Sequence, residues 1–182
     1  MKYAKNILAI EGEWTNRLTD KETIKSSLSF LDEVYGIKYI FRKVNTFNSL
    51  IDYLHQGTKA GYKKYGIIIL AFHGSKKGIE LEGKDISLKE LANECEGVLE
   101  DKLIHFSSCS IIQNIDEIRY FKKITGAKKV MGYSKDVDFL ESTLFDIALL
   151  QKLNEYDKAG NVVNYLQSNY PSLYEKLGFK LV

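Results

Sequence analysis

The chain has 182 residues, of which 45% are hydrophobic and one is proline, which suffices for one well-filled core but is short for two. We therefore expect a single domain over residues 1–182. The 26 lysines and arginines nearly balance the 24 aspartates and glutamates, and this charge balance argues against nucleic acid or a membrane as a partner. The start of the chain lacks the cleavage site of a secretory signal, no apolar run reaches the roughly 18 residues of a membrane span, and the two cysteines make no disulfide framework. These features together predict a cytoplasmic protein.

Short apolar runs alternate with amphipathic segments in the first part of the chain. We expect strands at residues 6–10, 37–44 and 65–72. Thr19 and Glu22 form a capping box for a helix that Gly36 ends, and Thr46 caps a second helix. The apolar faces of these two helices contain Ile24, Leu28, Leu31 and Val34, and Phe47, Leu50, Ile51 and Leu54.

Residues 78–88 interrupt this alternation. Ile79 to Glu82 alternate between apolar and charged side chains before a Gly-Lys turn, which is typical of a small exposed hairpin. The same stretch matches a phosphate-binding loop except at Asp85, where a carboxylate would repel phosphate, so we reject nucleotide hydrolysis. Ser87 and Glu90 then cap a helix, whose inward face contains Leu88, Leu91, Ala92 and Cys95.

The rest of the chain continues the same strand-and-helix pattern. We expect strands at residues 102–108 and 128–133 and an edge strand at 178–182. One helix is predicted around Ile115, Ile118, Phe121 and Ile124, a second over Phe139 to Leu153 behind a cap of Asp138 and Glu141, and a third over 162–169, before a turn that starts at Pro171. Alternating units with short connections favour a three-layer α/β sandwich around a mainly parallel sheet.

Two of the predicted strands end in a reactive side chain. His73 lies near the end of the run YGIIILAFHGS, and Cys109 lies near the end of DKLIHFSSCSI. Functional crevices of open α/β sheets lie beyond the carboxyl ends of the strands, and neighbouring strands are about 4.8 Å apart. If these strands are neighbours, an imidazole and a thiol meet there, as in a Cys/His nucleophilic site. The backbone N–H groups of Gly74 and Cys109 would point at the carbonyl oxygen of a substrate.

Each of these residues also has a purely structural interpretation. A free cysteine is commonly buried and inert, and a histidine at the end of a strand can be held there by hydrogen bonds alone. The small polar neighbours of Cys109 favour a thiol near an opening. His105 lies about 13 Å from Cys109 along one strand and cannot be its partner. We expect His55 at the surface and Cys95 in the core. No spacing resembles a zinc site, so neither a metal nor a cofactor is predicted.

Acidic residues follow the first and fifth predicted strands. Glu11 and Glu13 come after the first, and Asp136 and Asp138 come after the fifth. Helix capping explains Asp138. The others could form a negative pocket, because a carboxylate pairs well with an arginine or lysine of a substrate. We expect Glu11 and Asp136 to bind substrate in this way, with Glu11 the preferred candidate.

With these motifs identified, the chain resembles the caspase-like cysteine peptidases, the superfamily of caspases, separases and CHAT domains. The matching parts are AFHGS with His73, the hairpin and ISLKELA helix after it, and HFSSCS with Cys109, all within residues 65–112. From the EGEW opening to GYSKDVDFLES, most of the chain is also similar to a family of small uncharacterised bacterial caspase-like proteins.

The resemblance implies a three-layer sandwich, with His73 as the base, Cys109 as the nucleophile, and the Gly74 and Cys109 amides as oxyanion donors. It also implies cleavage of a protein or peptide substrate after a specified residue. Metacaspases carry Asp two residues before the nucleophile and caspases carry Gln, whereas this chain has Ser107, which is expected to bind substrate. The end of the first strand lines the pocket in those relatives, which favours Glu11 as the residue that recognises a basic side chain.

Two hypotheses of different classes follow from the sequence. The first is a cysteine endopeptidase, which the resemblance places among regulated effectors of defence or signalling with an upstream sensor or activator protein. The second is a catalytically silent relative that uses the same fold as a binding or scaffolding module. A nucleotide-binding domain ranks last, because the EGEW segment lacks the glycine-rich turn that such a domain needs after its first strand.

Overall fold

A six-stranded sheet forms the centre of the protein in the computed structural model, which describes residues 3–15, 17–19 and 21–182. Within these residues the strand order is β2-β1-β3-β7-β8-β9. All neighbouring strands pair in parallel except β9, which runs antiparallel to β8. The strands are β1 (Asn6–Glu11), β2 (Tyr39–Lys43), β3 (Tyr65–Ala71), β7 (Leu103–Phe106), β8 (Lys129–Tyr133) and β9 (Phe179–Leu181).

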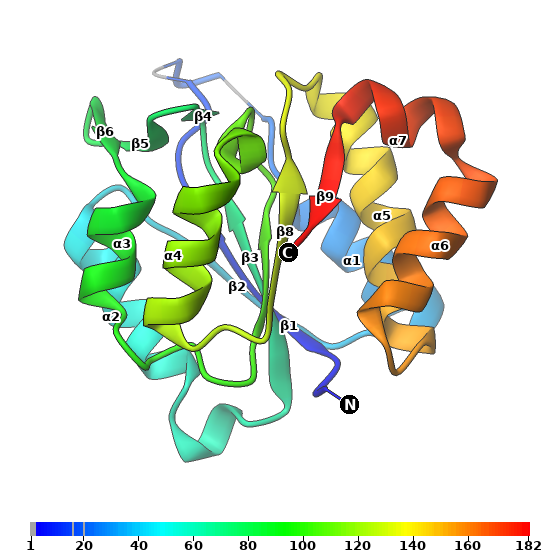
Figure 1. Ribbon diagram of the computed structural model, residues 1–182, viewed down its shortest axis with the longest axis horizontal. Helices are drawn as coiled ribbons and strands as arrows, with labels where there is room; N and C mark the ends of the chain where they lie inside the picture. Colours follow the sequence, from blue (N-terminus) through cyan, green and yellow to red (C-terminus); the bar gives the residue numbers. More distant parts are fainter. Residues whose placement is uncertain (1–2, 16, 20) are drawn as a thin grey trace.

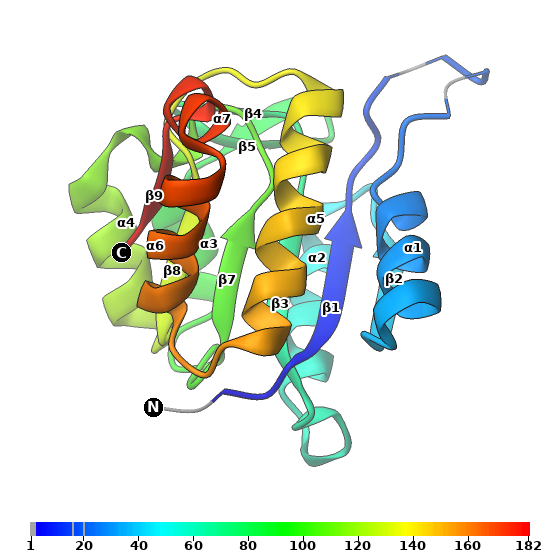
Figure 2. The ribbon, with the colours of Figure 1, turned by 90° about the vertical axis from the view of Figure 1, so that its right-hand side faces the viewer.

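Helices cover both faces of the sheet, which makes the predicted three-layer α/β architecture (Figures 1 and 2). On one face lie α2 (Phe47–Gly57), α3 (Leu88–Glu94) and α4 (Ile115–Thr125). On the other lie α1 (Lys25–Tyr35), α5 (Phe139–Glu155), α6 (Ala159–Asn169) and α7 (Pro171–Leu177). None of the helices in the described part of the chain is long and apolar enough to cross a membrane.

A small antiparallel sheet sits above the carboxyl ends of the parallel strands (Figure 1). It contains β4 (Gly74–Ser75), β5 (Gly78–Leu81) and β6 (Lys84–Ile86), so the predicted hairpin exists and gains a third strand. The expectation of an exposed hairpin is wrong for one of its faces. Ile79, Leu81 and Ile86 are buried because this face packs on the core, whereas the charged side chains between them are exposed. The described residues also form two single-turn 3-10 helices, η1 (Ala60–Tyr62) and η2 (Ile111–Gln113).

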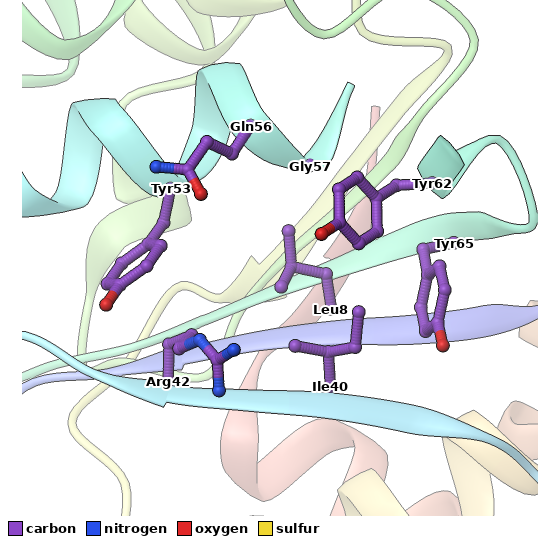
Figure 3. A pocket seen from close by; sticks show the side chains of 8 residues that line it. All are labelled: Leu8, Ile40, Arg42, Tyr53, Gln56, Gly57, Tyr62 and Tyr65. Atoms are coloured by element: carbon purple, nitrogen blue, oxygen red, sulfur yellow. The ribbon is translucent and has the colours of Figure 1, made fainter. Parts of the chain in front are cut away.

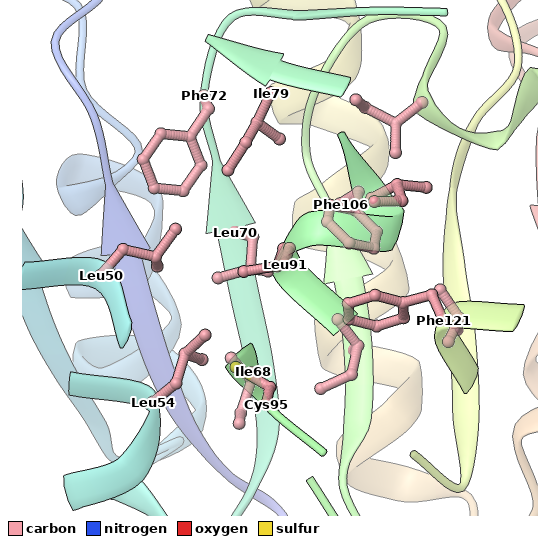
Figure 4. Close-up of a cluster of buried hydrophobic side chains, with 14 of the residues drawn as sticks. Leu50, Leu54, Ile68, Leu70, Phe72, Ile79, Leu91, Cys95, Phe106 and Phe121 are labelled. Carbon is pink, nitrogen blue, oxygen red and sulfur yellow. The ribbon is translucent and has the colours of Figure 1, made fainter. Parts of the chain in front are cut away.

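Two apolar clusters hold the layers together, one on each face of the sheet. Successive side chains of a strand point to opposite faces, so Ile68 and Leu70 of β3 join the cluster under α2 to α4, and Ile67 and Ile69 join the cluster under α1 and α5. Figure 4 shows Phe106, Phe121 and their neighbours in the first cluster. Burial on both faces explains why the strands read as continuous apolar runs.

Local capping signals predicted three of the helix starts correctly. The side chains of Thr46, Ser87 and Asp138 each accept a hydrogen bond from the backbone N–H three residues further on, at 3.1 to 3.2 Å. These contacts satisfy N–H groups that have no partner within the first turn of a helix.

The first predicted helix needs a correction at both ends. Thr19 and Glu22 do not cap it, because α1 begins at Lys25 and the backbone N–H of Ile24 is held by the distant carboxylate of Glu11 at 2.7 Å. Val34 was expected in the core, but it lies in the last turn beyond the buried stripe and is 57% exposed. The predicted turn at Pro171 is the start of a further helix, α7, since proline is well suited to a first helical position.

A stability measurement can test the cluster between the sheet and α2 to α4. Phe121 is fully buried, and its replacement by alanine leaves a cavity, so Phe121→Ala is expected to lower the free energy of unfolding by about 3–5 kcal/mol. Phe30→Ala is the matched control on α1, where the ring is 44% exposed, and it should cost less than about 1 kcal/mol. Urea denaturation of both variants checks the difference, and equal losses would contradict the packing described.

Candidate functional site

The pairing of β3 with β7 brings the segments that carry His73 and Cys109 to the same edge of the sheet. These two strands are neighbours, and each paired residue of β7 is numbered 36 higher than its partner, as in Leu70 and Phe106. His73 and Cys109 differ by the same 36 positions and follow the ends of their strands. The backbone N–H of Ser107 still bonds to the carbonyl of Leu70 at 3.0 Å, so the pairing continues toward the site.

Two contacts fix the loops that carry these residues against each other. The hydroxyl of Ser108 accepts a hydrogen bond from the backbone N–H of Phe72 at 3.1 Å and donates to the carbonyl of Leu70 at 3.4 Å. At Gly74, a Cβ atom would come within 2.7 Å of the Cys109 carbonyl oxygen and 2.9 Å of the Ser108 side chain. The two backbones therefore approach too closely for any side chain at position 74.

Cys109 is partly exposed and is enclosed by the loop that connects β8 to α5. Its sulfur accepts a hydrogen bond from the backbone N–H of Val137 at 3.4 Å and lies 3.6 Å from the Val137 carbonyl, to which the thiol can donate. The next residue, Ser110, has a left-handed backbone with φ of 54°, which is costly for a residue other than glycine. Its hydroxyl donates to Asp136 at 2.6 Å and its N–H donates to Lys135, and these bonds hold the sharp turn.

The imidazole of His73 is exposed and is oriented by Trp14. Its Nε2 atom bonds to the Trp14 carbonyl oxygen, which can only accept, so Nε2 carries the proton. In the neutral ring, Nδ1 is then the nitrogen that can accept a proton from another group. The Trp14 ring meets the His73 ring edge to face, with 5.4 Å between the ring centroids.

A pocket of about 510 Å³ contains both reactive side chains. Its walls are mainly apolar, and they include Trp14, Ile24, Val137 and Phe139. Polar groups in the lining come from Ser107, Ser108, Ser142, Thr143 and Glu22. The pocket combines apolar walls, a few polar groups, a thiol and an imidazole, which suits the binding of an organic substrate.

Glu11 was predicted to line this pocket, but the structure places its carboxylate beneath the pocket. Glu11 is fully buried, and its two oxygens accept hydrogen bonds from Trp14 Nε1, Thr23 Oγ1 and the Ile24 N–H at 2.7 to 2.9 Å. A carboxylate with these partners has no open face toward a substrate. The acidic residue in the lining is Glu22, which the sequence had assigned to a helix cap.

The two other predicted substrate residues have partners within the protein. Asp136 is exposed and accepts the hydroxyl of Ser110, so it supports the turn after Cys109. Ser107 lines the pocket as expected, while its hydroxyl donates to Asp146 of α5 at 2.6 Å. Asp146 is buried and also accepts from Tyr133 and from His105 Nε2. Burial, together with Asp146, raises the pKa of the Tyr133 phenol well above its usual value.

The remaining histidines and the second cysteine lie away from the pocket. His105 is buried on the α5 side of the sheet, and its Nδ1 atom lacks a hydrogen-bond partner among the described residues. His55 is exposed on α2, as predicted. Cys95 is fully buried in the core, also as predicted, and burial together with Glu94 raises the pKa of its thiol to about 12. Within the described part of the chain, no group of His, Cys, Asp and Glu side chains could hold a metal ion.

A second pocket, of about 380 Å³, lies between β2 and α2 (Figure 3). Leu8 and Ile40 lie between Arg42 and Tyr53 on one side and Tyr62 and Tyr65 on the other (Figure 3). The guanidinium carbon of Arg42 lies 5.8 Å from the centre of the Tyr53 ring. The lining includes none of the predicted site residues, and it contains no thiol, imidazole or carboxylate. The Cys109 pocket, which contains a thiol, an imidazole and a carboxylate, is therefore the better candidate for a functional site.

Sequence reasoning missed Trp14 and Val137, which shape the surroundings of the two reactive residues. Trp14 is the only tryptophan of the chain and lies three residues after the end of the first strand, which was an available signal. Val137 acts through its backbone, so its residue type gives no signal. The sequence identified Ser108 only as a small residue beside Cys109 and did not predict that its hydroxyl bonds to the end of β3.

Comparison with solved structures supports the three-layer α/β fold. The chain is similar to the X-ray structure of a secreted C11 cysteine protease from Bacteroides thetaiotaomicron in complex with an irreversible peptide inhibitor, with a TM-score of 0.57. The two sequences are 10% identical, and the match covers 96% of this chain and 59% of the protease chain. At this identity the likeness concerns the fold, and this chain spans little more than half of the protease's length.

Comparisons of sequence give a family without an assigned activity. No curated protein matches the chain. The model of a family described as "Family of unknown function (DUF6642)" matches residues 4–182. Because that match covers nearly the whole sequence, this chain belongs to the DUF6642 family.

Proposed function

We propose that this protein is a cysteine endopeptidase in which Cys109 is the nucleophile and His73 is the base. The observation that carries the proposal is that the two residues follow the ends of adjacent strands and line one pocket. The likeness to a C11 cysteine protease gives the coarser support, since it suggests peptidase activity at the level of the fold.

The proposed reaction begins when His73 takes the proton of the Cys109 thiol at Nδ1 and the sulfur attacks the carbonyl carbon of a peptide bond. The carbonyl oxygen becomes an anion, for which the backbone N–H groups of Gly74 and Cys109 are the proposed donors. The C–N bond then breaks, His73 returns the proton to the leaving amine, and an acyl-enzyme thioester remains. Water that loses a proton to His73 hydrolyses this thioester and releases the thiol.

The pocket beside Cys109 supports the proposal that cleavage follows a basic residue. The aliphatic part of a lysine or arginine suits the walls made by Trp14, Ile24 and Phe139, and its charged end would reach the carboxylate of Glu22. Glu22 thus replaces Glu11 as the residue proposed to recognise the basic side chain. The upstream sensor or activator implied by the resemblance stays a prediction.

One observation favours the second candidate function, a catalytically silent binding module. The hydrogen bonds that the structure gives to the thiol of Cys109 and the Nε2 atom of His73 are with the backbone of Val137 and Trp14. A peptidase would require these bonds to rearrange when substrate binds, as catalytic hydrogen bonds often do. The reactivity of the thiol separates the two.

Substitution of the two reactive residues tests the peptidase directly. Cys109→Ala and His73→Ala are each expected to abolish cleavage of a peptide library, because one removes the nucleophile and the other the base. Cys95→Ala and His55→Ala are the matched controls and should keep full turnover. Circular dichroism confirms that each variant is folded, and unchanged turnover in Cys109→Ala would refute the assignment.

Alkylation with iodoacetamide at neutral pH distinguishes the enzyme from the silent module. Cys95 should react slowly, because it is buried and its raised pKa keeps the thiol protonated. We expect Cys109 to react at least about tenfold faster and to lose most of this advantage in His73→Gln, because the base is gone. Peptide mass spectrometry measures both rates. Equally slow labelling of the two thiols, or a Cys109 rate unaffected by His73→Gln, would favour the binding module.

The role of Glu22 can be tested with peptides that differ only before the scissile bond. Glu22→Gln removes the charge that pairs with the substrate, so kcat/KM for an arginine substrate should fall about tenfold or more. The value for a leucine substrate should stay the same. Glu33→Gln on the exposed side of α1 serves as the control. An equal fall for both substrates would contradict recognition through charge.

A further inference from the structure

We infer that Glu11 is a positioning residue, whose buried carboxylate sets the orientation of His73 through Trp14. The inference concerns the segment of residues 12–23 that connects β1 to α1, hereafter the 12–23 segment. Its consequence for catalysis rests on the proposed function, whereas its structural content does not. Glu11 was predicted to bind substrate, but its carboxylate contacts Trp14, Thr23 and Ile24 of the protein itself.

The Glu11 carboxylate connects the start of the 12–23 segment to its end. One oxygen accepts from Trp14 Nε1 at 2.9 Å and from the backbone N–H of Ile24 at 2.7 Å, and the other accepts from Thr23 Oγ1 at 2.8 Å. Glu11 itself is held in the sheet between β2 and β3, paired with Lys43 and Ala71. A rigid strand therefore carries the group to which both ends of the segment are attached.

The 12–23 segment depends on these contacts because its described residues form no helix or strand. Figure 2 shows residues 12–15 rising from the end of β1 at the carboxyl edge of the sheet, and residues 21–23 leading into α1. At its start, Gly12 lies so close to the Phe72 ring that a Cβ atom would come within 2.6 Å of it. The segment thus passes directly over the residue that precedes His73.

Trp14 transmits this position to the reactive site in two ways. Its carbonyl oxygen accepts the Nε2 proton of His73, which selects the tautomer that presents Nδ1. Its ring contacts the rings of His73 and Phe139 edge to face, with centroids 5.4 and 5.5 Å apart. Trp14, Ile24 and Phe139 are also walls of the Cys109 pocket. Loss of the Glu11 carboxylate would therefore disturb both the base and the pocket.

The chain provides two spectroscopic signals for a test that needs no enzymatic activity. Trp14 is the only tryptophan, and His73 is one of three histidines. In Glu11→Gln we expect Trp14 emission to move to longer wavelength and acrylamide to quench it more strongly, because the ring is released to water. The imidazole NMR signal of His73, assigned with His73→Gln, should shift as the Trp14 ring moves away, while the signals of His55 and His105 stay in place.

Glu13→Gln is the matched control for these signals. It removes a carboxylate two residues further along, where the side chain is exposed and lies 3.4 Å from the Asn45 amide, so the Trp14 signals should be unaffected. Glu13 lines one hollow with His73, so the shift of His73 in this variant measures the effect of a lost charge alone, and Glu11→Gln should exceed it. Unchanged Trp14 and His73 signals in Glu11→Gln would overturn the inference. A shift of all three histidine signals would also overturn it, because it would indicate a general change of the fold.

Kinetics then connect the positioning to catalysis. If the wild-type protein cleaves peptides, Glu11→Gln should lower kcat by about 10- to 100-fold, as expected for a misplaced base. It should also lower the alkylation rate of Cys109. A wild-type protein that cleaves no peptide would refute the proposed function and leave the spectroscopic test standing. Normal kcat in a variant whose His73 signal has shifted would overturn the catalytic part of the inference.

A milder variant covers the case in which Glu11→Gln fails to fold. Thr23→Val keeps the shape of the side chain and removes one of the three donors to the carboxylate. We expect it to shift the Trp14 and His73 signals in the same direction as Glu11→Gln but by less, with far-UV circular dichroism unchanged. A folded Thr23→Val protein with wild-type signals would count against the inference.

Discussion

The parallel pairing of β3 with β7 is the constraint on which the site depends. This pairing sets a constant offset of 36 residues, and the same offset relates His73 to Cys109. The side chains of β3 are close-packed in apolar clusters on both faces of the sheet, and the Ser108 hydroxyl, beyond the end of β7, bonds to Phe72 and Leu70, so packing and these bonds together hold the register. Part of the energy that fixes the reactive residues is therefore the burial of side chains such as Ile68 and Ile69, which take no part in the chemistry.

Much of the architecture could be predicted because each signal was local or periodic. Apolar runs marked the buried strands, and Thr46, Ser87 and Asp138 marked helix starts through bonds that span three residues. The predicted start at Thr19 failed because the N–H of Ile24 is satisfied by Glu11, thirteen positions away. No local pattern reveals that kind of partner.

The candidate site was predictable where residue type alone indicates chemistry. His73 and Cys109 stand out as reactive side chains at strand ends, and they line one pocket in the structure. Burial decided the cases in which sequence misled: an acidic residue after a strand is usually exposed, whereas Glu11 is buried beneath Trp14. The backbone of Val137 at the sulfur could not be foreseen, since backbone groups are present at every position.

The close approach at Gly74 has a consequence for how this protein can change over time. A methyl group there would meet the Cys109 carbonyl, so no other amino acid fits at position 74 unless the loop that carries Cys109 shifts as well. Positions far from the site are under no such restriction: Gly61 in η1 and Gly160 in α6 have open space where a Cβ would stand. Drift can therefore alter these distant segments, while the spacing of His73 and Cys109 is inherited unchanged.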